Sequence, residues 1–396
     1  MAEAFITRRG GSNGGVNQTL PEQLTAFTAV ADSTPQITLS WENPTEYWAG
    51  TLIVKKAGSA PEGVNDGEKI YKGEGTSYTD TAVEYDVTYY YRAFPYNAKK
   101  QYQTEVLTVS AMARSGLLVS TLPVGSFIKV PVLSAYQSRF GENIMWEVAD
   151  KNHSGYPSNS VTLITEKIIQ LMVFDAKEPN NSNSDRKRYG NNRYLHSNLL
   201  QWLNSNAAAG AWYSAQHSAD APPTNANVYS NYNEYDAWAG FLAMLEPKFI
   251  AKLLDTTQTV VKNTVTDGGS YETVTSKMFL ASTTEVGLAN ENSIAEGSLL
   301  ALFSNDASRV AYPTSQCVSN SEYTNTNFTT SKGWYWWLRT PYSSNARYVR
   351  YVDSGGTLNS NSAYHGDWGV RPLCNISGNA LVDPTPNADG SYTLIG

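Results

Sequence analysis

The stretch GWYWWLRTPYSSNARYVRYVDSGGTLNSNSAYHGDWGVRP, residues 333–372, decides how this chain is interpreted. Two blocks that each contain an Arg and large apolar residues, 334–341 and 369–372, bracket a polar segment of Tyr, Ser, Asn, Asp, Arg and His. Tyr offers a rigid contact with a polar tip, and Ser, Gly and Asn offer adaptable hydrogen bonds, as in many binding surfaces. The flanks are therefore predicted to be core and the middle a ligand-binding surface.

The spacing inside this segment supports the same interpretation. Ala346, Val349 and Val352 recur at every third position, which suits neither an exposed helix nor a simple alternating strand. We expect these three side chains to be fixed anchors and the Tyr and Arg residues between them to face outward. An ordinary surface loop would explain the Gly and Ser content but not the density of aromatic and Arg residues.

Composition limits the rest of the molecule. The chain has 396 residues, 41% of them hydrophobic and only 16% charged, so two or three globular domains with largely uncharged polar surfaces are expected. The formal net charge of -7 argues against a nucleic-acid partner, which would require a basic face. No apolar run approaches the ~20 residues of a membrane span, so no membrane insertion is expected.

The N-terminus and the cysteines point to a protein made in the bacterial cytoplasm. MAEAFITRRGGSNGG has no apolar core and no cleavage pattern of a signal peptide, so export by the general secretory route is not expected. Cys317 and Cys374 could form a disulfide, but two buried thiols are the favoured state. Residues 1–19 are interpreted as a Gly-rich N-terminal arm or attachment segment, with a disordered tail as the alternative.

Residues 20–112 are predicted to be a small all-β domain. Runs typical of strands alternate with turn signals, at 36–41, 50–56, 76–80, 87–94 and 105–111. ITLSWENP around Trp41, followed by VTYYYRAFPYN, resembles a fibronectin type III domain, an immunoglobulin-like sandwich. The resemblance implies a core Trp41 and a tyrosine corner, with Tyr89 the better candidate and Tyr90 the other. Such modules act as spacers, so no chemistry is assigned to this one.

After a linker at 113–123, a second domain at 118–396 is predicted to be α+β. Strands are expected at 127–132, 145–148 and 161–171, helices at 194–204 and 247–254, and a hairpin over 256–280. Ser282 and Glu285 have the spacing of a capping box before another short helix.

Catalytic motifs are scarce, and we expect no enzyme, no cofactor and no metal. The chain has four His residues without a metal-ligand spacing, no P-loop and no GxSxG nucleophile elbow. Glu178-Pro179-Asn180 spells the EPN motif of mannose-type C-type lectins, but their WND triplet is missing. One carboxylate and one amide are too few for calcium, so a solvated loop is favoured there.

A regularity in the genetic code accompanies the polar segment. Tyr, Ser, Arg, Asp and His can each be reached from an AAC codon for Asn by changing only adenines. Asn345, Asn359 and Asn361 would be unaltered positions, whereas Trp368 cannot arise in this way and is treated as scaffold or left undecided.

Residues 118–396 resemble the C-type-lectin-fold variable proteins of diversity-generating retroelements of phages and gut bacteria. The matching stretches are WEVADKNHSGYPSNSVTLIT, YGNNRYLHSNLLQWLNS, WWLRTP and GVRPLCNISG. In that family a retroelement rewrites adenine-derived codons near the C-terminus, and the lectin fold presents the varied side chains to solvent. Carried over by position, thirteen ligand-binding residues, here called the display residues, are Tyr342, Ser343, Ser344, Arg347, Tyr348, Arg350, Tyr351, Asp353, Ser360, Ser362, Tyr364, His365 and Asp367.

The same blocks supply the expected structural anchors. Large apolar residues should be buried there, and the two Arg side chains should bond to buried carbonyls or a carboxylate, because an unpaired buried charge is very costly. The anchors are Trp334, Trp336, Trp337, Arg339, Val370 and Arg371, supported by Leu338 and Leu373.

The resemblance implies a diversified receptor-binding or ligand-binding adhesin in the tail or virion of a phage. Its expected partners are a host-cell surface protein or glycan and, through the N-terminal region, other virion proteins. A homo-oligomer such as a trimer is left open. The alternative function is a carbohydrate-binding adhesin of fixed specificity. A third, enzymatic alternative rests on the similarity of the lectin-like fold to formylglycine-generating enzymes, but Cys317 and Cys374 lack the close spacing of their cysteine pair.

Overall fold

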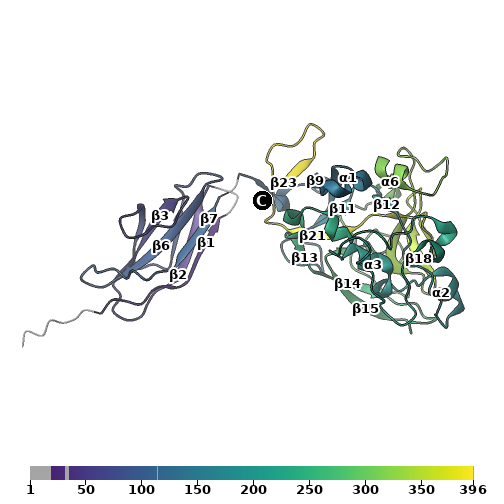
Figure 1. The fold of residues 1–396 in the computed structure, drawn as a ribbon, viewed down its shortest axis with the longest axis horizontal. Coiled ribbons are helices and arrows are strands. Elements are labelled where there is room, and N and C mark those ends of the chain that lie inside the picture. Colours follow the sequence, from purple (N-terminus) through teal and green to yellow (C-terminus); the bar gives the residue numbers. More distant parts are fainter. Residues whose placement is uncertain (1–18, 32–34, 114, 396) are drawn as a thin grey trace, which may run out of the picture. The chain divides into compact units, whose positions relative to one another are not determined.

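The computed structural model describes residues 19–31, 35–113 and 115–395. The predicted arm at 1–19 falls almost wholly outside the described residues. The chain divides into two compact units, Met1–Ser115 and Gly116–Gly396, which are called the first and second unit below (Figure 1). Among the described residues helices reach six residues at most, too short to traverse a bilayer.

The first unit is a sandwich of two antiparallel sheets. One sheet has the order β1-β2-β5 and the other β4-β3-β6-β7. Alternating side chains of both sheets form the buried core between them, with Ile37, Leu39 and Trp41 contributed by β2. The unit is therefore a fibronectin type III-like sandwich. Its strands are β1 Thr25–Ala31, β2 Ile37–Glu42, β3 Gly50–Ala57, β4 Glu68–Gly73, β5 Ser77–Asp80, β6 Thr88–Tyr96 and β7 Thr108–Met112.

The two aromatic landmarks of this unit occupy their predicted places. Trp41 is buried, with ring centroids 6.4 Å from Phe27 and 5.2 Å from Tyr71. The Tyr89 hydroxyl accepts a hydrogen bond from the backbone N–H of Glu84 at 3.2 Å, so Tyr89 rather than Tyr90 forms the tyrosine corner. Strands β1 and β4 lie outside the runs that sequence patterning identified.

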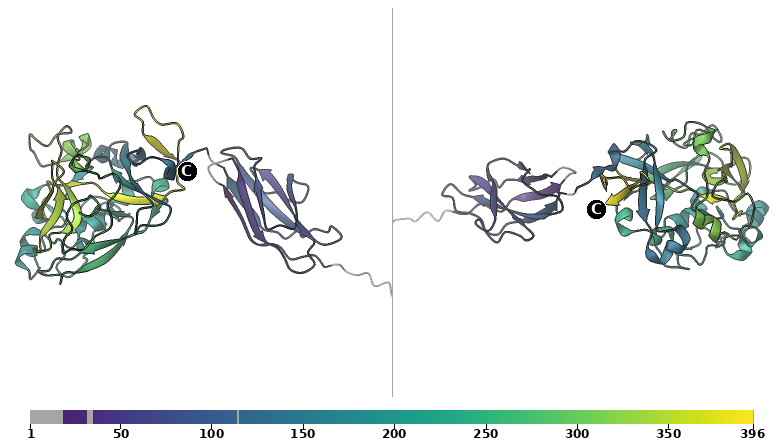
Figure 2. Two further views of the ribbon diagram at one scale, coloured as in Figure 1. Left: turned by 180° about the vertical axis from the view of Figure 1, so that it is seen from behind. Right: turned by 90° about the horizontal axis from the view of Figure 1, so that it is seen from above.

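The second unit is built from short strands joined by long connections. The largest sheet has the order β13-β21-β11-β10-β9-β23-β22-β8, with β16 also paired to β21. A second sheet has the order β12-β20-β17-β18-β19, and β14 and β15 form a separate pair. The yellow strand β23 lies beside the blue strand β9, its parallel partner (Figures 1 and 2).

The strands of the second unit are β8 Leu117–Leu118, β9 Phe127–Pro131, β10 Asn143–Lys151, β11 Ser160–Thr165, β12 Gln170–Leu171, β13 Leu253–Leu254, β14 Thr256–Val261, β15 Tyr271–Ser276, β16 Met278–Phe279, β17 Trp336–Pro341, β18 Tyr348–Val352, β19 Leu358–Ser362, β20 Gly369–Val370, β21 Leu373–Ser377, β22 Leu381–Val382 and β23 Tyr392–Ile395. Its α-helices are α1 Gln137–Phe140, α2 Ser184–Tyr189, α3 Asn198–Leu203, α4 Pro247–Ile250, α5 Asp306–Arg309 and α6 Ser315–Asn320. Short 3-10 turns include Val119–Thr121, Ser134–Tyr136, Tyr194–His196, Asn225–Asn227, Tyr229–Asn231 and Phe241–Met244.

The predicted helices are present but shorter. The helix predicted at 194–204 is a 3-10 turn followed by α3, which ends at Leu203. The predicted helix at 247–254 stops at Ile250, because Leu253 and Leu254 extend and pair with β21 instead. Tertiary pairing thus overrides the apolar periodicity of this stretch.

Two further local predictions have mixed outcomes. The hairpin forms, with Thr256 opposite Ser276 and Val261 opposite Tyr271. Ser282 and Glu285 make the reciprocal bonds of a capping box, at 3.0 and 3.1 Å, yet turns rather than a helix follow. The predicted linker at 113–123 also includes β8, which pairs with β22, so its later residues belong to the second unit.

Strand β17 separates two hydrophobic clusters of the second unit. Trp337 packs into one cluster, while Trp336 and Leu338 pack into the other, because alternate side chains of a strand point to opposite faces. Cys317 and Cys374 lie in different clusters as free thiols, and burial raises the pKa of each. The favoured state of two buried thiols is the one observed.

Candidate ligand-binding surface

The tryptophans of the first block form a buried frame. Trp334, Trp336 and Trp337 are at most 6% exposed. Their indole N–H groups donate to the carbonyls of Asp367, Arg309 and Met172 at 2.9–3.0 Å. Each ring therefore buries a large apolar area without leaving its polar atom unpaired. The frame joins β17 to segments distant in sequence.

Arg339 lies at the centre of a buried polar cluster. Its guanidinium binds both carboxylate oxygens of Glu285, at 2.6 and 2.9 Å, and donates to the carbonyls of Leu280 and Glu296 at 2.8 and 2.7 Å. Both members of the ion pair are buried. The bonding matches the expectation of a carboxylate or carbonyl partner, and it combines a bidentate pair with backbone acceptors.

Arg371 is held differently. Its guanidinium donates to the backbone carbonyls of Thr165 and Glu166, at 3.0 and 3.2 Å, and lies 5.0 Å from the ring centroid of Trp336. Burial lowers the pKa of Arg371 to about 10, and the neighbouring carboxylates of Glu147 and Glu166 only partly compensate. Val370, the remaining anchor, is fully buried.

A second carboxyl beside Arg339 gives a prediction about pH. Burial is the largest influence on Glu296 and raises its pKa to about 7 from an ordinary 4.5. The folded protein then retains a proton that the unfolded chain releases above pH 4.5, so this residue lowers the free energy of unfolding as pH rises from 4.5 to about 7. Glu296→Gln, which mimics the protonated acid, should remove this contribution.

The measurement is chemical denaturation of the full chain between pH 4 and 8, comparing Glu296→Gln with the parent. The variant should gain stability relative to the parent as pH rises through the window. Glu142→Gln alters an exposed carboxyl and serves as the control. Parallel stability curves for Glu296→Gln and the parent would show that Glu296 titrates normally.

The polar segment at 342–368, here called the display segment, contains three small anchors that are buried as expected. Ala346, Val349 and Val352 are at most 1% exposed. Val349 faces the cluster that contains Trp337, and Val352 faces the one that contains Trp336. The segment is thus fixed at positions between the display residues.

The main chain of the display segment is held by side chains from outside it. Asn192 is buried, and its amide nitrogen lies 3.3, 2.7 and 2.9 Å from the carbonyl oxygens of Tyr342, Asn345 and Tyr348. The Asn263 amide in turn donates to the Asn192 carbonyl oxygen at 2.8 Å. These bonds use backbone atoms of the display segment, so they are independent of which side chains it carries.

The exposure of the thirteen display residues is uneven. Ser344 is exposed, and eight others are half-buried: Tyr342, Arg347, Tyr348, Arg350, Asp353, Ser360, Tyr364 and His365. Four are buried at 5–8% exposure, namely Ser343, Tyr351, Ser362 and Asp367. The expectation that all thirteen project into water is wrong for these four.

Strand alternation explains the difference for Tyr351. In the β18–β19 hairpin Tyr348 lies opposite Ser362 and Arg350 opposite Ser360, so these four share one face. Tyr351 points to the other face, with its ring 5.4 Å from Trp368 and 6.1 Å from Trp337. The display residues therefore wrap around the hairpin and do not occupy one flat face.

Contacts between rings and guanidinium groups nevertheless connect both faces. Tyr189 and Trp368, which are outside the thirteen, bridge the display residues. The successive contacts, 4.2–6.3 Å apart, run through Arg350, Tyr342, Tyr348, Arg347, Tyr189, Tyr364, His365, Trp368 and Tyr351.

Acidic residues outside the segment support its two Arg side chains. Arg350 pairs with Glu291, and Arg347 pairs with Asp185 at 3.0 Å. Asp353 instead closes its own turn by accepting bonds from the N–H groups of Gly355 and Thr357, each at 2.9 Å. Burial opposes its ionisation, but these bonds and the Thr357 hydroxyl outweigh burial and lower the pKa of Asp353.

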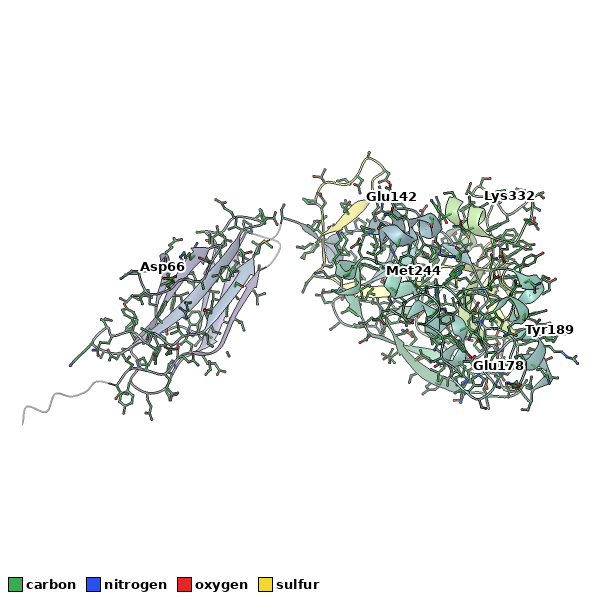
Figure 3. The ribbon with its side chains drawn as sticks, in the orientation of Figure 1. Asp66, Glu142, Glu178, Tyr189, Met244 and Lys332 are labelled. Atoms are coloured by element: carbon green, nitrogen blue, oxygen red, sulfur yellow. The ribbon has the colours of Figure 1, made fainter. Side chains whose placement is uncertain are left out.

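The EPN stretch does not behave as a solvated loop throughout. Pro179 and Asn180 are exposed, but Glu178 is fully buried and accepts a bond from the Asn191 amide at 3.0 Å. Glu178 thus fastens the loop to the unit, which corrects the expectation for this residue. Figure 3 labels Glu178 near Tyr189, at the end of the second unit that carries α2.

Sequence spacing missed one group with potential metal ligands. Within the described residues, ligand atoms of Glu178, His217 and Asp220 lie within 4.8 Å of one another. Carboxylates and imidazole are ordinary ligands of divalent zinc. The His217 Nε2 atom already lies 2.8 Å from a Glu178 oxygen, so direct contact between these two side chains accounts for their proximity. Motifs that depend on short ligand spacing could not identify this group, because Glu178 lies some 40 residues before His217 and Asp220.

Comparisons with known proteins identify one family. A family model described as "Domain of unknown function (DUF6273)" matches residues 159–378, more than half of the chain. No curated protein matches.

Three of the solved structures that resemble this chain each match about a quarter of it. One of them, described as FN3tt, has 14% sequence identity and a TM-score of 0.20. The match covers 25% of this chain and 99% of that chain. An Fn3-like protein from Clostridium thermocellum has 20% sequence identity and a TM-score of 0.20. The match covers 23% of this chain and 92% of that chain. A beta-1,2-glucanase from Parabacteroides distasonis has 18% sequence identity and a TM-score of 0.20. The match covers 26% of this chain and 15% of that chain.

Proposed function

The chain belongs to the family of domains of unknown function matched over 159–378 (DUF6273), and we propose that it is a ligand-binding protein whose display residues are diversified. The second unit would then be a C-type-lectin-type domain, varied by a diversity-generating retroelement. The first unit would act as a spacer, with no chemistry of its own.

One observation carries the proposal: the display segment is fixed through its backbone and its small anchors. Asn192 binds three of its carbonyls, and Thr264 donates to the Ser343 carbonyl through its N–H and hydroxyl groups, at 2.8 and 3.0 Å. Neither residue contacts a display side chain through these bonds. Side chains that are exposed and make no ion pair can therefore change with little effect on stability, typically within ~0.5 kcal/mol. Arg350 is an exception among the half-buried positions, because it pairs with buried Glu291.

The four buried display residues limit this freedom. Tyr351 fills space against Trp368, so small replacements there would leave a cavity. Ser343 and Ser362 have little room for a larger side chain. We expect true variation to concentrate at Ser344 and the eight half-buried positions.

The proposed setting is a phage particle. There the second unit would bind a host-cell surface protein or glycan, and the N-terminal region would contact other virion proteins. The support for this setting is the resemblance of residues 118–396 to variable proteins, together with the spacer-like first unit.

Deep sequencing of the codons for residues 334–372 across a population tests the proposal. We expect substitutions at adenine-containing codons of Ser344 and the half-buried display positions, with Ala346, Val349 and Trp337 unchanged. A near-copy of this region, differing only at adenines and adjacent to a reverse transcriptase gene, should accompany it. Uniform codons without such a copy would favour the alternative, a carbohydrate-binding adhesin of fixed specificity.

A further inference from the structure

A groove of about 660 Å³ borders the display residues at the end of the second unit that carries α2. It lies between α2, the 3-10 turns at Asn225–Asn227 and Tyr229–Asn231, and the display residue Tyr364. The Tyr229 N–H donates to the Tyr364 carbonyl, and the Tyr364 N–H donates to that of Tyr189, at 2.9 and 3.1 Å. Backbone bonds therefore join the walls to each other.

The charge of this groove is opposite to that of the chain as a whole. Lys177, Lys187 and Arg188 line it, and no carboxylate does so among the residues that the structure describes. The chain as a whole carries a formal charge of -7. Three cations around one groove thus mark a local concentration of positive potential.

Two acidic residues that adjoin the lining in sequence, Glu178 and Asp185, already have partners. Asp185 pairs with Arg347, and buried Glu178 pairs with His217 at 2.8 Å. Lys187 and Arg188 are exposed and form no ion pair with a carboxylate in the described part of the chain. Their charges are available to a ligand.

Aromatic and hydroxyl groups complete the lining. Tyr229 is 36% exposed as a residue, and one face of its ring stacks on His365 at a centroid distance of 4.2 Å. Lys177 lies 5.6 Å from the ring centroid of Tyr364. Ser184 and Ser230 add hydroxyls that can donate or accept. A ligand here would meet flat ring faces, hydroxyl partners and cations together.

We infer that this groove binds an anionic glycan. Its sugar rings would lie against Tyr229 and Tyr364, its hydroxyls would meet Ser184 and Ser230, and its carboxylate or sulfate groups would pair with Lys187 and Arg188. An acidic peptide would use the cations but would not require the ring faces. Because Tyr364 is the one display residue in this lining, the cations, the serine hydroxyls and the Tyr229 ring would stay constant while the side chain at 364 varies. The inference rests on the proposed function only in that last respect.

The test is isothermal titration calorimetry of the full chain with four probes: hexagalacturonate, a heparin-derived hexasaccharide, neutral maltohexaose and hexaglutamate. We expect one or both anionic hexasaccharides to bind, and to bind less tightly when NaCl is raised from 20 to 300 mM. Which of the two binds distinguishes carboxylate from sulfate recognition. Equal binding of maltohexaose or of hexaglutamate would overturn the inference, as would absence of binding by both anionic hexasaccharides.

Variants locate the site. The double substitution Lys187→Gln and Arg188→Gln should weaken binding about tenfold or more, since two charge-assisted contacts are lost. Lys248→Gln with Lys332→Gln removes two exposed cations outside the groove and should leave affinity unchanged (Lys332 is labelled in Figure 3). All four positions are exposed, so melting curves should coincide. If both double variants weakened hexasaccharide binding equally, affinity would depend only on the net charge of the chain, and the groove would not be the binding site.

This result is separable from that of the proposed function. If hexasaccharide binding is absent but population sequencing shows varied display codons, the groove inference fails alone. If binding is present and the codons are uniform, the diversification proposal fails alone.

Discussion

Replacing Arg339 with Met should lower the free energy of unfolding of the second unit by about 3–5 kcal/mol, the range for breaking a buried pair from one side. Glu285 would then be a buried carboxylate without its bidentate partner, retaining only bonds from the Ser282 N–H and the Tyr156 hydroxyl. The carbonyls of Leu280 and Glu296 would also lose a donor. Urea denaturation followed by Trp fluorescence suits the measurement, because eight of the ten Trp residues lie in the second unit.

Two companion variants make this result specific to the buried pair. Adding Glu285→Gln to Arg339→Met removes the stranded charge and should restore part of the loss, giving a coupling that single substitutions cannot show. Lys129→Gln breaks a partly exposed pair with Asp389 and should cost about 0–1 kcal/mol. A loss for Arg339→Met no larger than that for Lys129→Gln would refute the anchoring role.

Sequence patterning predicted elements whose signals are local. Five of the seven strands of the first unit (all but β1 and β4), the Tyr89 corner and the hairpin β14–β15 each depend on alternation or turn residues within a short window. The burial of the Trp frame followed from composition alone. The residue types at 346, 349 and 352 also identified the anchors of the display segment.

Predictions failed where distant segments decide the outcome. Helix periodicity at 247–254 gave way to pairing of Leu253 and Leu254 with β21. Glu285 has a capping-box spacing, but its carboxylate is also engaged by Arg339. Tyr351 was grouped with its neighbours by residue type, whereas alternation along β18 places it on the face opposite to Tyr348 and Arg350. The partners of Leu253, Leu254 and Glu285 lie outside any window that periodicity can read, whereas strand alternation within 348–352 could have separated Tyr351 from its neighbours.

The supports of the display segment were the least predictable part. Asn192 lies some 150 residues before the carbonyls it binds, in a polar stretch that resembles an ordinary loop. The basic groove likewise gathers Lys177, α2 and Tyr229 around Tyr364 through backbone bonds between separate segments. A sequence can suggest that an Asn in such a stretch is buried, but it cannot identify the carbonyl groups to which that Asn donates.

Replacing Asn192 with Ala is expected to cost about 2–4 kcal/mol, because it leaves buried polar groups without partners. The Asn345 carbonyl loses its donor at 2.7 Å, and the Asn263 amide loses an acceptor at 2.8 Å. The effect should be local as well as global: hydrogen exchange over residues 342–352 should accelerate more than exchange in β9 and β10.

Asn206→Ala, at an exposed Asn of the same unit, is the matched control and should change neither quantity. Substitutions of Ser344 and Tyr348 on the intact Asn192 background should also be nearly neutral, because the backbone contacts persist whatever those side chains are. If the side-chain variants destabilised the unit as much as Asn192→Ala, the segment would depend on its own side chains. It could not then tolerate free exchange of residues, and the proposal of a diversified surface would lose its physical basis.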